Sequence, residues 1–334
     1  MNRIRPFVAL LLLFSLALSM SACRPIDTQT HMPSAEHPLT YLVLGFDDAA
    51  ENTDVMFLVA FDPETPRTAI IQIPRDTYLS TGYAQNKINQ IFASRRAAGD
   101  TERDALAYVR DLLSGTLGIP LTATVGISMS AFRRTVDAIG GVDMTLTEDI
   151  VLDTEDGREP LALSAGAHHI DGETAERFVR YRRRYARGDL GRMDAQKVFL
   201  SAFFHTVKDT LGAREMIALA DVLSDAYVTD VPLLTLVQTA INYLPSLRRT
   251  SLCYATLPGE ATQSDTGLWY YVVNRKGASE LLARYFGAEQ TAFDPAHRLT
   301  REEDIAFDNI YSDTRFSYRV YDDGELSQMH VPRT

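Results

Sequence analysis

The stretch YLVLGFDDAAENTDVMFLVAFDPETPRTAIIQI, residues 41–73, contains three apolar runs separated by short polar segments. The runs cover Tyr41 to Leu44, Val55 to Phe61 and Thr68 to Ile73. Each has the length and the aliphatic or aromatic composition of a buried strand. Two further runs of this kind, Ala123 to Ile127 and Val142 to Leu146, follow along the chain. The pattern therefore predicts at least five strands in the first half of the protein.

Helical segments alternate with these strands. Thr101 and Ser128 are expected to cap two helices, the first with Asp104 placed as in a capping box, and a longer helix is expected from Gly191 to Leu211. Strands interleaved with helices predict an α/β fold, a three-layer α/β/α sandwich with a central mixed sheet. Beyond residue 211 we expect helices over Arg214 to Ala226, Pro232 to Tyr243 and Lys276 to Tyr285. Strands are expected over Thr250 to Leu257 and Leu268 to Val273. A hairpin is expected over Phe316 to Met329, with its turn at Asp323-Gly324.

The first residues have the features of an export signal. Residues 1–22 combine a basic start, an apolar run and small residues before Cys23, and Ser21-Ala22-Cys23 resembles the lipobox of bacterial lipoproteins. We therefore expect a lipid on Cys23 and a chain held at the extracytoplasmic face of the cell membrane. The alternative is an uncleaved helical anchor, but the apolar run of about 16 residues is shorter than the roughly 20 needed to cross a bilayer.

The rest of the chain divides by composition. Residues 23–39 are polar and rich in proline, which predicts a flexible tether. Residues 40–290 hold the apolar runs and are expected to form the catalytic domain. Residues 291–334 form a polar tail, in which the hairpin is the expected structure.

Seven arginines lie in the stretch RFVRYRRRYARGDLGR, residues 177–192, although the chain carries a formal net charge of -11. Neighbouring like charges repel one another, so the cluster predicts an anionic partner. Nucleic acid is not expected, because its readers are usually basic as whole domains. For an exported protein, phosphates, pyrophosphates and wall polymers are the remaining anions.

Six segments then follow one another in a specific order. They are YLVLGFD ending at Asp47, NTDVMFLV with Asp54, IPRDTYL with Arg75 and Asp76, NKINQ with Lys87, IGGVDM, and AGAHHIDGETAERFVRYR followed by GDLGRMDAQ. This series resembles the LytR-CpsA-Psr family of bacterial cell-wall ligases, and it spans residues 41–211. The resemblance implies a phosphotransferase that moves a glycopolymer from a polyprenyl pyrophosphate carrier onto peptidoglycan. Teichoic acid, capsule and other wall glycans all remain open as the polymer.

The resemblance also implies site residues. Asp47 and Asp54 would bind Mg²⁺ or Mn²⁺, and one of them would assist deprotonation of the acceptor hydroxyl. Arg75 and Arg182 would join these two as catalytic residues. The residues expected to bind the pyrophosphate are Arg75, Lys87, Arg180, Arg182, Arg192 and Gln196, with Asn89 as a further candidate. Arginine forks and a hard cation held by carboxylates suit phosphoryl transfer, which depends on positioning and charge neutralisation.

The lipid tail of the carrier is expected in an apolar cleft of the core. Phe199 and Phe203 are candidates for its lining, although an ordinary core position is the simpler expectation for both. The other four arginines, Arg177, Arg183, Arg184 and Arg187, are expected at the surface or in ion pairs. Glu173 and Glu176 stand at helical spacing from such partners and would form exposed pairs.

Two positions depart from the family pattern. Asn52, followed by Thr53, stands where many members have an arginine, and Ala195 stands where an arginine often precedes the glutamine. Two contacts to the pyrophosphate are thus missing. Arg184 and Arg187 are nearby candidates to compensate for them, but their spacing does not show it.

Two other functions also fit the residues. The first is a hydrolase of polyprenyl pyrophosphate, which would use the same metal and arginines with water as acceptor. The second is a non-catalytic lipoprotein that binds wall polymer in a regulatory role. Replacing Asp47 by alanine would leave function intact only in this last case.

Lipidation at Cys23 is directly testable. We expect metabolic labelling with a radioactive fatty acid to mark the wild-type protein and to be lost in Cys23→Ala, because the thiol is the acylated group. Unchanged labelling of the variant would rule out the lipid anchor at this residue.

Overall fold

The computed structural model describes residues 38–46, 52–80, 85–153, 157–181, 185, 189–210, 212, 227–287, 318–327 and 329. Residues His37–Thr334 form one compact unit. The strands are β1 (Leu39–Phe46), β2 (Thr53–Asp62), β3 (Arg67–Ile73), β4 (Ala123–Ser128), β5 (Val142–Leu146), β6 (Ile150–Leu152), β7 (Leu161–Leu163), β8 (Gly166–Ile170), β9 (Tyr227–Thr229), β10 (Ser251–Thr256), β11 (Gly259–Gln263), β12 (Trp269–Val273) and β13 (Val320–Asp322). The helices are η1 (Ile88–Gln90), α2 (Ile91–Ala97), α3 (Glu102–Leu117), α4 (Met129–Ala138), α5 (Gly172–Arg180), α6 (Asp189–Thr210), α8 (Leu233–Asn242), α9 (Leu244–Leu247), α10 (Arg275–Phe286) and α11 (Asp323–Ser327).

Seven strands of the described residues form the central sheet, in the order β13-β10-β3-β2-β1-β4-β9. Strand β1 pairs antiparallel with β2 and parallel with β4, and β10 pairs parallel with β3. The sheet is therefore mixed, as the sequence predicts. In the β1–β2 pairing Phe46 lies opposite Thr53, and in the β2–β3 pairing Met56 lies opposite Ile73. The end of β1, the start of β2 and the end of β3 therefore lie at the same end of the sheet.

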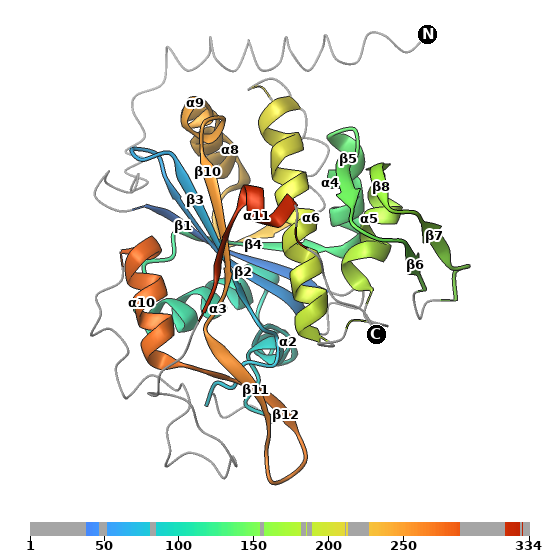
Figure 1. Ribbon diagram of the computed structural model, residues 1–334. Helices are drawn as coiled ribbons and strands as arrows, with labels where there is room; N and C mark the ends of the chain where they lie inside the picture. Colours follow the sequence, from blue (N-terminus) through green and yellow to red (C-terminus); the bar gives the residue numbers. More distant parts are fainter. Residues whose placement is uncertain are drawn as a thin grey trace, which may run out of the picture. The chain divides into compact units, whose positions relative to one another are not determined.

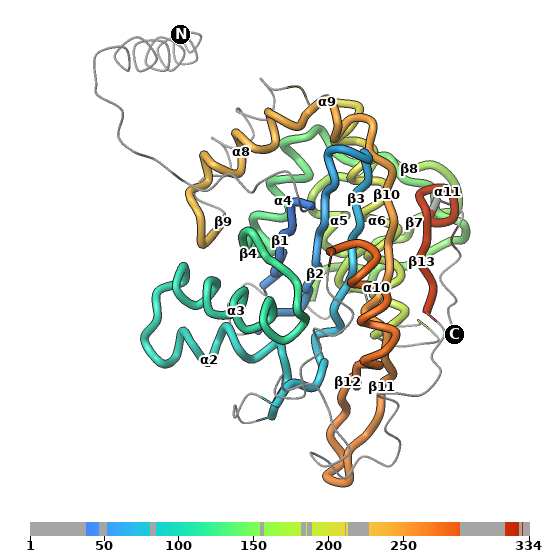
Figure 2. The backbone as a smooth tube through the Cα atoms, turned by 90° about the vertical axis from the view of Figure 1, so that its left-hand side faces the viewer, coloured from blue at the N-terminus to red at the C-terminus, as the bar shows by residue number. Residues whose placement is uncertain are grey.

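The two faces of the sheet are covered by different helices. On β1, Leu42 and Leu44 point into a cluster shared with α2, α3 and α10, whereas Val43 packs on the opposite side with residues of α6. Figure 1 shows α3 and α10 on one side of the strands and α6 on the other, and Figure 2 looks onto the face with α3 and α10. This alternation follows from the two-residue period of a strand. It confirms the expected three-layer α/β/α arrangement.

The expected strand over Val142 to Leu146 forms, but it does not join the central sheet. As β5 it pairs with β8 and with no other strand of the described residues, and its side chains alternate between buried and exposed. Gly140 and Gly141 have positive φ angles of 88° and 93°, a conformation that glycine adopts without strain. They let the chain turn sharply after α4, and β5 then packs in a second apolar cluster with residues of α4, α5 and α6.

The predicted helix starts are present. The backbone N–H of Asp104 donates to Thr101 Oγ1 at 3.2 Å, and Ala131 N–H donates to Ser128 Oγ at 3.1 Å. Asp171 caps α5 in the same way through Thr174 N–H, at 2.9 Å. These caps satisfy N–H groups that have no partner within the helix. Local sequence therefore sets where α3, α4 and α5 begin.

The C-terminal segment differs from its expected structure. In place of a hairpin about Asp323-Gly324, β13 pairs antiparallel with β10 and the chain then enters α11. Asp322 Oδ1 accepts from the backbone N–H of Glu325 at 2.8 Å and so caps this short helix. The free edge of β10 supplies the partner that a second hairpin strand would otherwise provide.

Several expectations lie outside the described residues. These are the signal segment and tether with Cys23, the helix over Arg214 to Ala226, and site residues Asp47 and Arg182 with the neighbouring Arg183, Arg184 and Arg187. Within the described part of the chain, no helix has both the length and the apolar character that crossing a membrane requires.

Candidate functional site

An apolar cavity lies between the central sheet and helices α4, α5 and α6. Its empty space, the open mouth included, is about 790 Å³. Apolar side chains from β1, β2, α4 and α6 make most of its wall, among them Val43, Phe57, Phe132 and Phe199. The polar side chains that line it are Asp54, Ser128, Arg180, Arg192 and Gln196. Four of the predicted site residues thus share one cavity.

Phe199 is part of this lining and Phe203 is not. Phe203 packs on the Phe199 ring, with 6.2 Å between ring centroids, in the apolar cluster behind the wall. The two phenylalanines therefore separate into one cavity residue and one core residue.

Arg75 is the centre of a cluster of carboxylates. Its Nη1 donates to Asp54 Oδ1 at 2.6 Å, and its Nε lies 3.8 Å from Asp76 Oδ2 and 3.9 Å from Asp189 Oδ2. The start of β2, the loop after β3 and the first turn of α6 thus meet at one point. Burial by itself lowers the pKa of Arg75, but Asp189, Asp54 and Asp76 outweigh it and raise that pKa above its ordinary value.

The Nε of Arg75 is also buried and has no hydrogen-bond partner among the described residues. A buried donor of this kind costs free energy unless it is paired. Asp76 and Asp189 lie close to this Nε and provide charge compensation without a hydrogen bond to it.

Lys87 stands beside this cluster. Its Nζ lies 2.9 Å from Asp76 Oδ1 and 5.4 Å from the centroid of the Tyr270 ring. Asn89, in η1, has a buried Oδ1 with no hydrogen-bond partner among the described residues. Neither residue lines the apolar cavity, and Lys87 lies on the side of the site that Asp76 occupies.

Arg192 and Gln196 lie on one face of α6 and are both buried. Arg192 Nη2 is 2.9 Å from Asp189 Oδ1. Gln196 accepts from Gln72 Nε2 at 2.7 Å and donates to the carbonyl of Val179 at 3.0 Å. These contacts hold the α6 face against β3 and α5. Ala195, where an arginine is common, is 1% exposed in the second apolar cluster.

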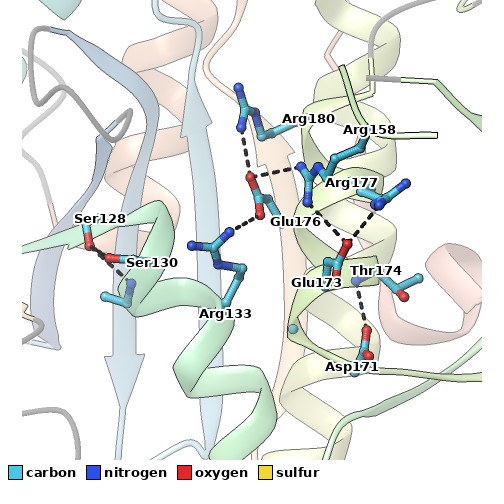
Figure 3. Close-up of polar contacts among 12 residues, drawn as sticks. Ser128, Ser130, Arg133, Arg158, Asp171, Glu173, Thr174, Glu176, Arg177 and Arg180 are labelled. Atoms are coloured by element: carbon cyan, nitrogen blue, oxygen red, sulfur yellow. Dashed lines mark hydrogen bonds and ion pairs between the residues drawn. The ribbon is translucent and has the colours of Figure 1, made fainter. Parts of the chain in front are cut away.

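Glu176 is a buried carboxylate that holds three arginines (Figure 3). Arg180 and Arg133 donate to its two oxygens at 2.8 Å each, and Arg158 donates at 3.3 Å. Glu176 is 1% exposed, so the expectation of an exposed pair is wrong for this residue. Burial raises the pKa of Glu176, but the hydrogen bonds and charges of the three arginines lower it by a larger amount. The pKa of Glu176 therefore lies below its ordinary value.

The neighbouring pair behaves as expected. Arg177 Nη2 lies 2.8 Å from Glu173 Oε1 at i,i+4 spacing, and the Glu173 side chain is 58% exposed. The Arg177 side chain is only 12% exposed, and neither residue of the pair lines the cavity. Arg180 thus differs from Arg177 in two ways: it contacts Glu176, and it lies on the cavity wall.

Two functional residues were not identified from sequence. Asp189 lies three residues before Arg192 in the segment GDLGRMDAQ, and this i,i+3 spacing is a usable signal for a helical ion pair. Glu176 carries no such signal for Arg133 and Arg158, which are 43 and 18 residues away in sequence. The packing of α4 against α5 brings Arg133 to Glu176, and Arg158 reaches it from the segment between β6 and β7.

These features define a class of protein. An apolar cavity with arginine side chains on its wall, next to further cations and carboxylates, suits an amphiphile with an anionic head group. The chain belongs to the LytR_cpsA_psr family, whose model matches residues 17–286.

Relatives of known name match most of the chain. A polyisoprenyl-teichoic acid–peptidoglycan teichoic acid transferase TagU of Oceanobacillus iheyensis is 25% identical over 244 residues, 70% of this chain and 70% of that protein. A TagU of Bacillus anthracis is 27% identical over 248 residues, 72% of this chain and 75% of that protein.

Solved structures share the fold. Protein gbs0355 from Streptococcus agalactiae superposes with a TM-score of 0.66 at 19% identity, covering 80% of this chain and 94% of that one. TagT bound to LIIa-WTA superposes with a TM-score of 0.59 at 22% identity, covering 80% of this chain and 98% of that one. At these identities the likeness concerns the fold alone.

Glu176 predicts a specific pH dependence of stability. A carboxylate with a lowered pKa stabilises the folded state above its unfolded pKa, near 4.5, and this contribution disappears as pH falls through the folded value. We expect Glu176→Gln to lower the free energy of unfolding at pH 7 by about 1.5–3 kcal/mol, because charged hydrogen bonds are lost. The difference from wild type should shrink as pH falls below 4.5.

Glu173→Gln is the matched control for this measurement. Glu173 pairs with Arg177 at i,i+4 spacing and lies 3.6 Å from Arg158, but the Glu173 side chain is 58% exposed, so we expect a change below about 0.5 kcal/mol. Urea unfolding at several pH values measures both variants. Equal effects of the two substitutions at pH 7 would contradict the assignment of Glu176 as the buried anchor.

Proposed function

We propose that this protein transfers a glycopolymer from a polyprenyl pyrophosphate carrier to peptidoglycan. The observation that carries the proposal is the apolar cavity with Asp54, Arg180 and Arg192 on its wall. An isoprenoid chain needs a long apolar site, and its pyrophosphate needs cations at the end of that site. The TagU names of the relatives support this reaction and favour a teichoic acid as the polymer.

The proposed reaction is a phosphoryl transfer in which one P–O bond forms and one breaks. A hydroxyl oxygen of the acceptor forms a bond to the phosphorus that carries the glycopolymer, and the bond from that phosphorus to the bridging oxygen breaks. Polyprenyl phosphate leaves, and the hydroxyl proton passes to a carboxylate, for which Asp54 is the candidate among the described residues. The product is a phosphodiester between polymer and peptidoglycan.

The main catalytic role of the arginines is to position the phosphates and neutralise their charge. Phosphoryl transfer proceeds through a loose transition state, so enzymes accelerate it by positioning the groups and neutralising their charge. Arg180 and Arg192 are held by Glu176 and Asp189, and Arg75 is held by Asp54. Fixed cations of this kind stabilise developing charge without reorganising during the reaction.

A divalent cation fits the same site. Asp54 lines the cavity with a carboxylate, and Mg²⁺ typically needs only one or two carboxylates besides the phosphates of the substrate. In the described part of the chain, no three His, Cys, Asp or Glu side chains gather as a metal site. We propose that Asp54 and Asp47 hold Mg²⁺ or Mn²⁺ together with the pyrophosphate. The ion would supply charge neutralisation of the phosphate oxygens.

The place of action is part of the proposal. We propose that Cys23 carries a lipid and that the catalytic domain works at the extracytoplasmic face of the membrane. A carrier lipid and peptidoglycan are both present there, and the lipobox-like segment supports the assignment.

Replacing Asp54 tests the reaction. We expect Asp54→Asn to reduce transfer of glycopolymer to peptidoglycan by at least about 100-fold, because it removes a charge that positions Arg75 and the metal. The assay follows radioactive polymer from a polyprenyl pyrophosphate donor into purified peptidoglycan, with and without added Mg²⁺. Asp62→Asn, at the other end of β2, should retain wild-type activity.

The same assay separates the alternatives. Release of polymer into solution at the same rate with and without peptidoglycan would identify a hydrolase and contradict the proposal. Binding of donor without turnover, unchanged in Asp54→Asn, would identify a non-catalytic binding protein.

Narrowing the cavity tests the lipid site. We expect Val43→Phe to raise KM about tenfold for a long-chain donor and much less for a donor with two or three isoprene units, since the ring occupies space on the cavity wall. Val151→Phe, on the exposed side of β6, should change neither value. Equal KM changes for both donors would place the lipid elsewhere.

A further inference from the structure

A second cleft lies across helix α6 from the apolar cavity. Arg192, Gln196 and Phe199 face the cavity, whereas Leu190, Asp194 and Lys197 line the second cleft. Its empty space, open solvent included, is about 700 Å³. The three- and four-residue spacing within each set places the two sets on different faces of α6. One helix thus separates two concave sites.

The opposite wall of this cleft includes the C-terminal segment. Tyr318, Arg319 and Tyr321 line it, and they come from the chain in and just before β13. This wall lies outside residues 17–286, which the family model matches. The antiparallel pairing of β13 with β10 fixes the segment in place.

The groups in the cleft suit a sugar chain. The guanidinium of Arg319 lies 4.6 Å from the centroid of the Tyr321 ring, and Lys197 Nζ lies 5.8 Å from it. Lys197 also pairs with Asp194 at 2.7 Å. Tyrosine rings offer flat apolar faces for the C–H side of a sugar, while hydroxyls and charged groups bond its hydroxyl and amide groups. The lining mixes these two kinds of surface, unlike the apolar cavity.

The cleft borders the Arg75 cluster on two sides. Tyr271, which lines it, donates its backbone N–H to the carbonyl of Asp76 at 2.8 Å. Leu190 directly follows Asp189, whose carboxylate lies 3.9 Å from Arg75 Nε. The cleft therefore lies next to the Arg75 cluster, on the side of α6 opposite to the apolar cavity.

We propose that this cleft binds the peptidoglycan glycan strand that accepts the polymer. The inference rests on the proposed transfer reaction and names the site of its second substrate. In phosphoryl transfer the attacking and leaving oxygens lie roughly in line on opposite sides of the phosphorus. Donor and acceptor sites on opposite faces of α6, joined at Arg75, meet this requirement.

Two variants test the cleft in the full-length protein. Arg319→Ala and Tyr318→Ala remove side chains from its wall, and we expect each to raise KM for a glycan-strand acceptor about five- to tenfold. The KM for the polyprenyl pyrophosphate donor should stay at the wild-type value. Calorimetric titration with a tetrasaccharide of alternating N-acetylglucosamine and N-acetylmuramic acid measures binding without turnover, and Kd should rise by the same factor.

Arg284→Ala is the matched control. Arg284 is likewise an exposed arginine over a tyrosine ring, 5.2 Å from the centroid of Tyr285, but it lies on α10 at the other face of the sheet. We expect both constants to be unchanged in this variant. Thermal unfolding of all three variants checks that the fold is retained.

The outcomes separate the cleft from the reaction. Wild-type KM and Kd for the glycan in both Arg319→Ala and Tyr318→Ala would overturn the cleft assignment, with the transfer reaction unaffected. A wild-type protein that binds the tetrasaccharide but transfers no polymer would overturn the proposed function. In that case, loss of binding in the two variants would still support the cleft.

Discussion

Compensation of charge around the arginines is the constraint on which the site depends. Arginines gathered for an anionic ligand repel one another unless carboxylates hold them when the ligand is absent. Asp54 and Asp189 do this for Arg75, and Glu176 does it for Arg180. Asp189 and Arg75 belong to different elements, so their attraction also holds α6 against the end of β3. The groups that prepare the site for pyrophosphate therefore also contribute to the packing of the layers.

Helix α6 connects the packing to the proposed chemistry. Its first half is buried nearly all round, including the charged residues Arg192, Asp194 and Lys197. Buried charges are tolerated only when paired, and each of these has an oppositely charged neighbour within three residues. A helix that is buried on several sides can present one face to a lipid cavity and another to a polar cleft. This arrangement allows two substrates to meet at its N-terminal end.

Much of the fold is readable from local sequence. The strands from Tyr41 to Ile73 and the caps at Thr101 and Ser128 depend on neighbouring residues only, through the two-residue period of strands and the unpaired N–H groups of helix starts. The partner of a strand depends on distant residues instead. For this reason the sequence predicts the strand β5 but not its partner β8, and the segment of β13 was expected in a hairpin but pairs with β10.

The sequence by itself determined the alternation of strands and helices, the family, and four of the residues on the cavity wall. Those features lie in short segments, whose residue types and spacing carry the information. Only the tertiary structure decided which carboxylate holds which arginine. Glu176 reaches Arg133 across 43 residues, and Asp54 reaches Arg75 across 21. Such pairs form because packing brings separate elements within hydrogen-bond distance, where burial strengthens their attraction, and no local pattern records that proximity.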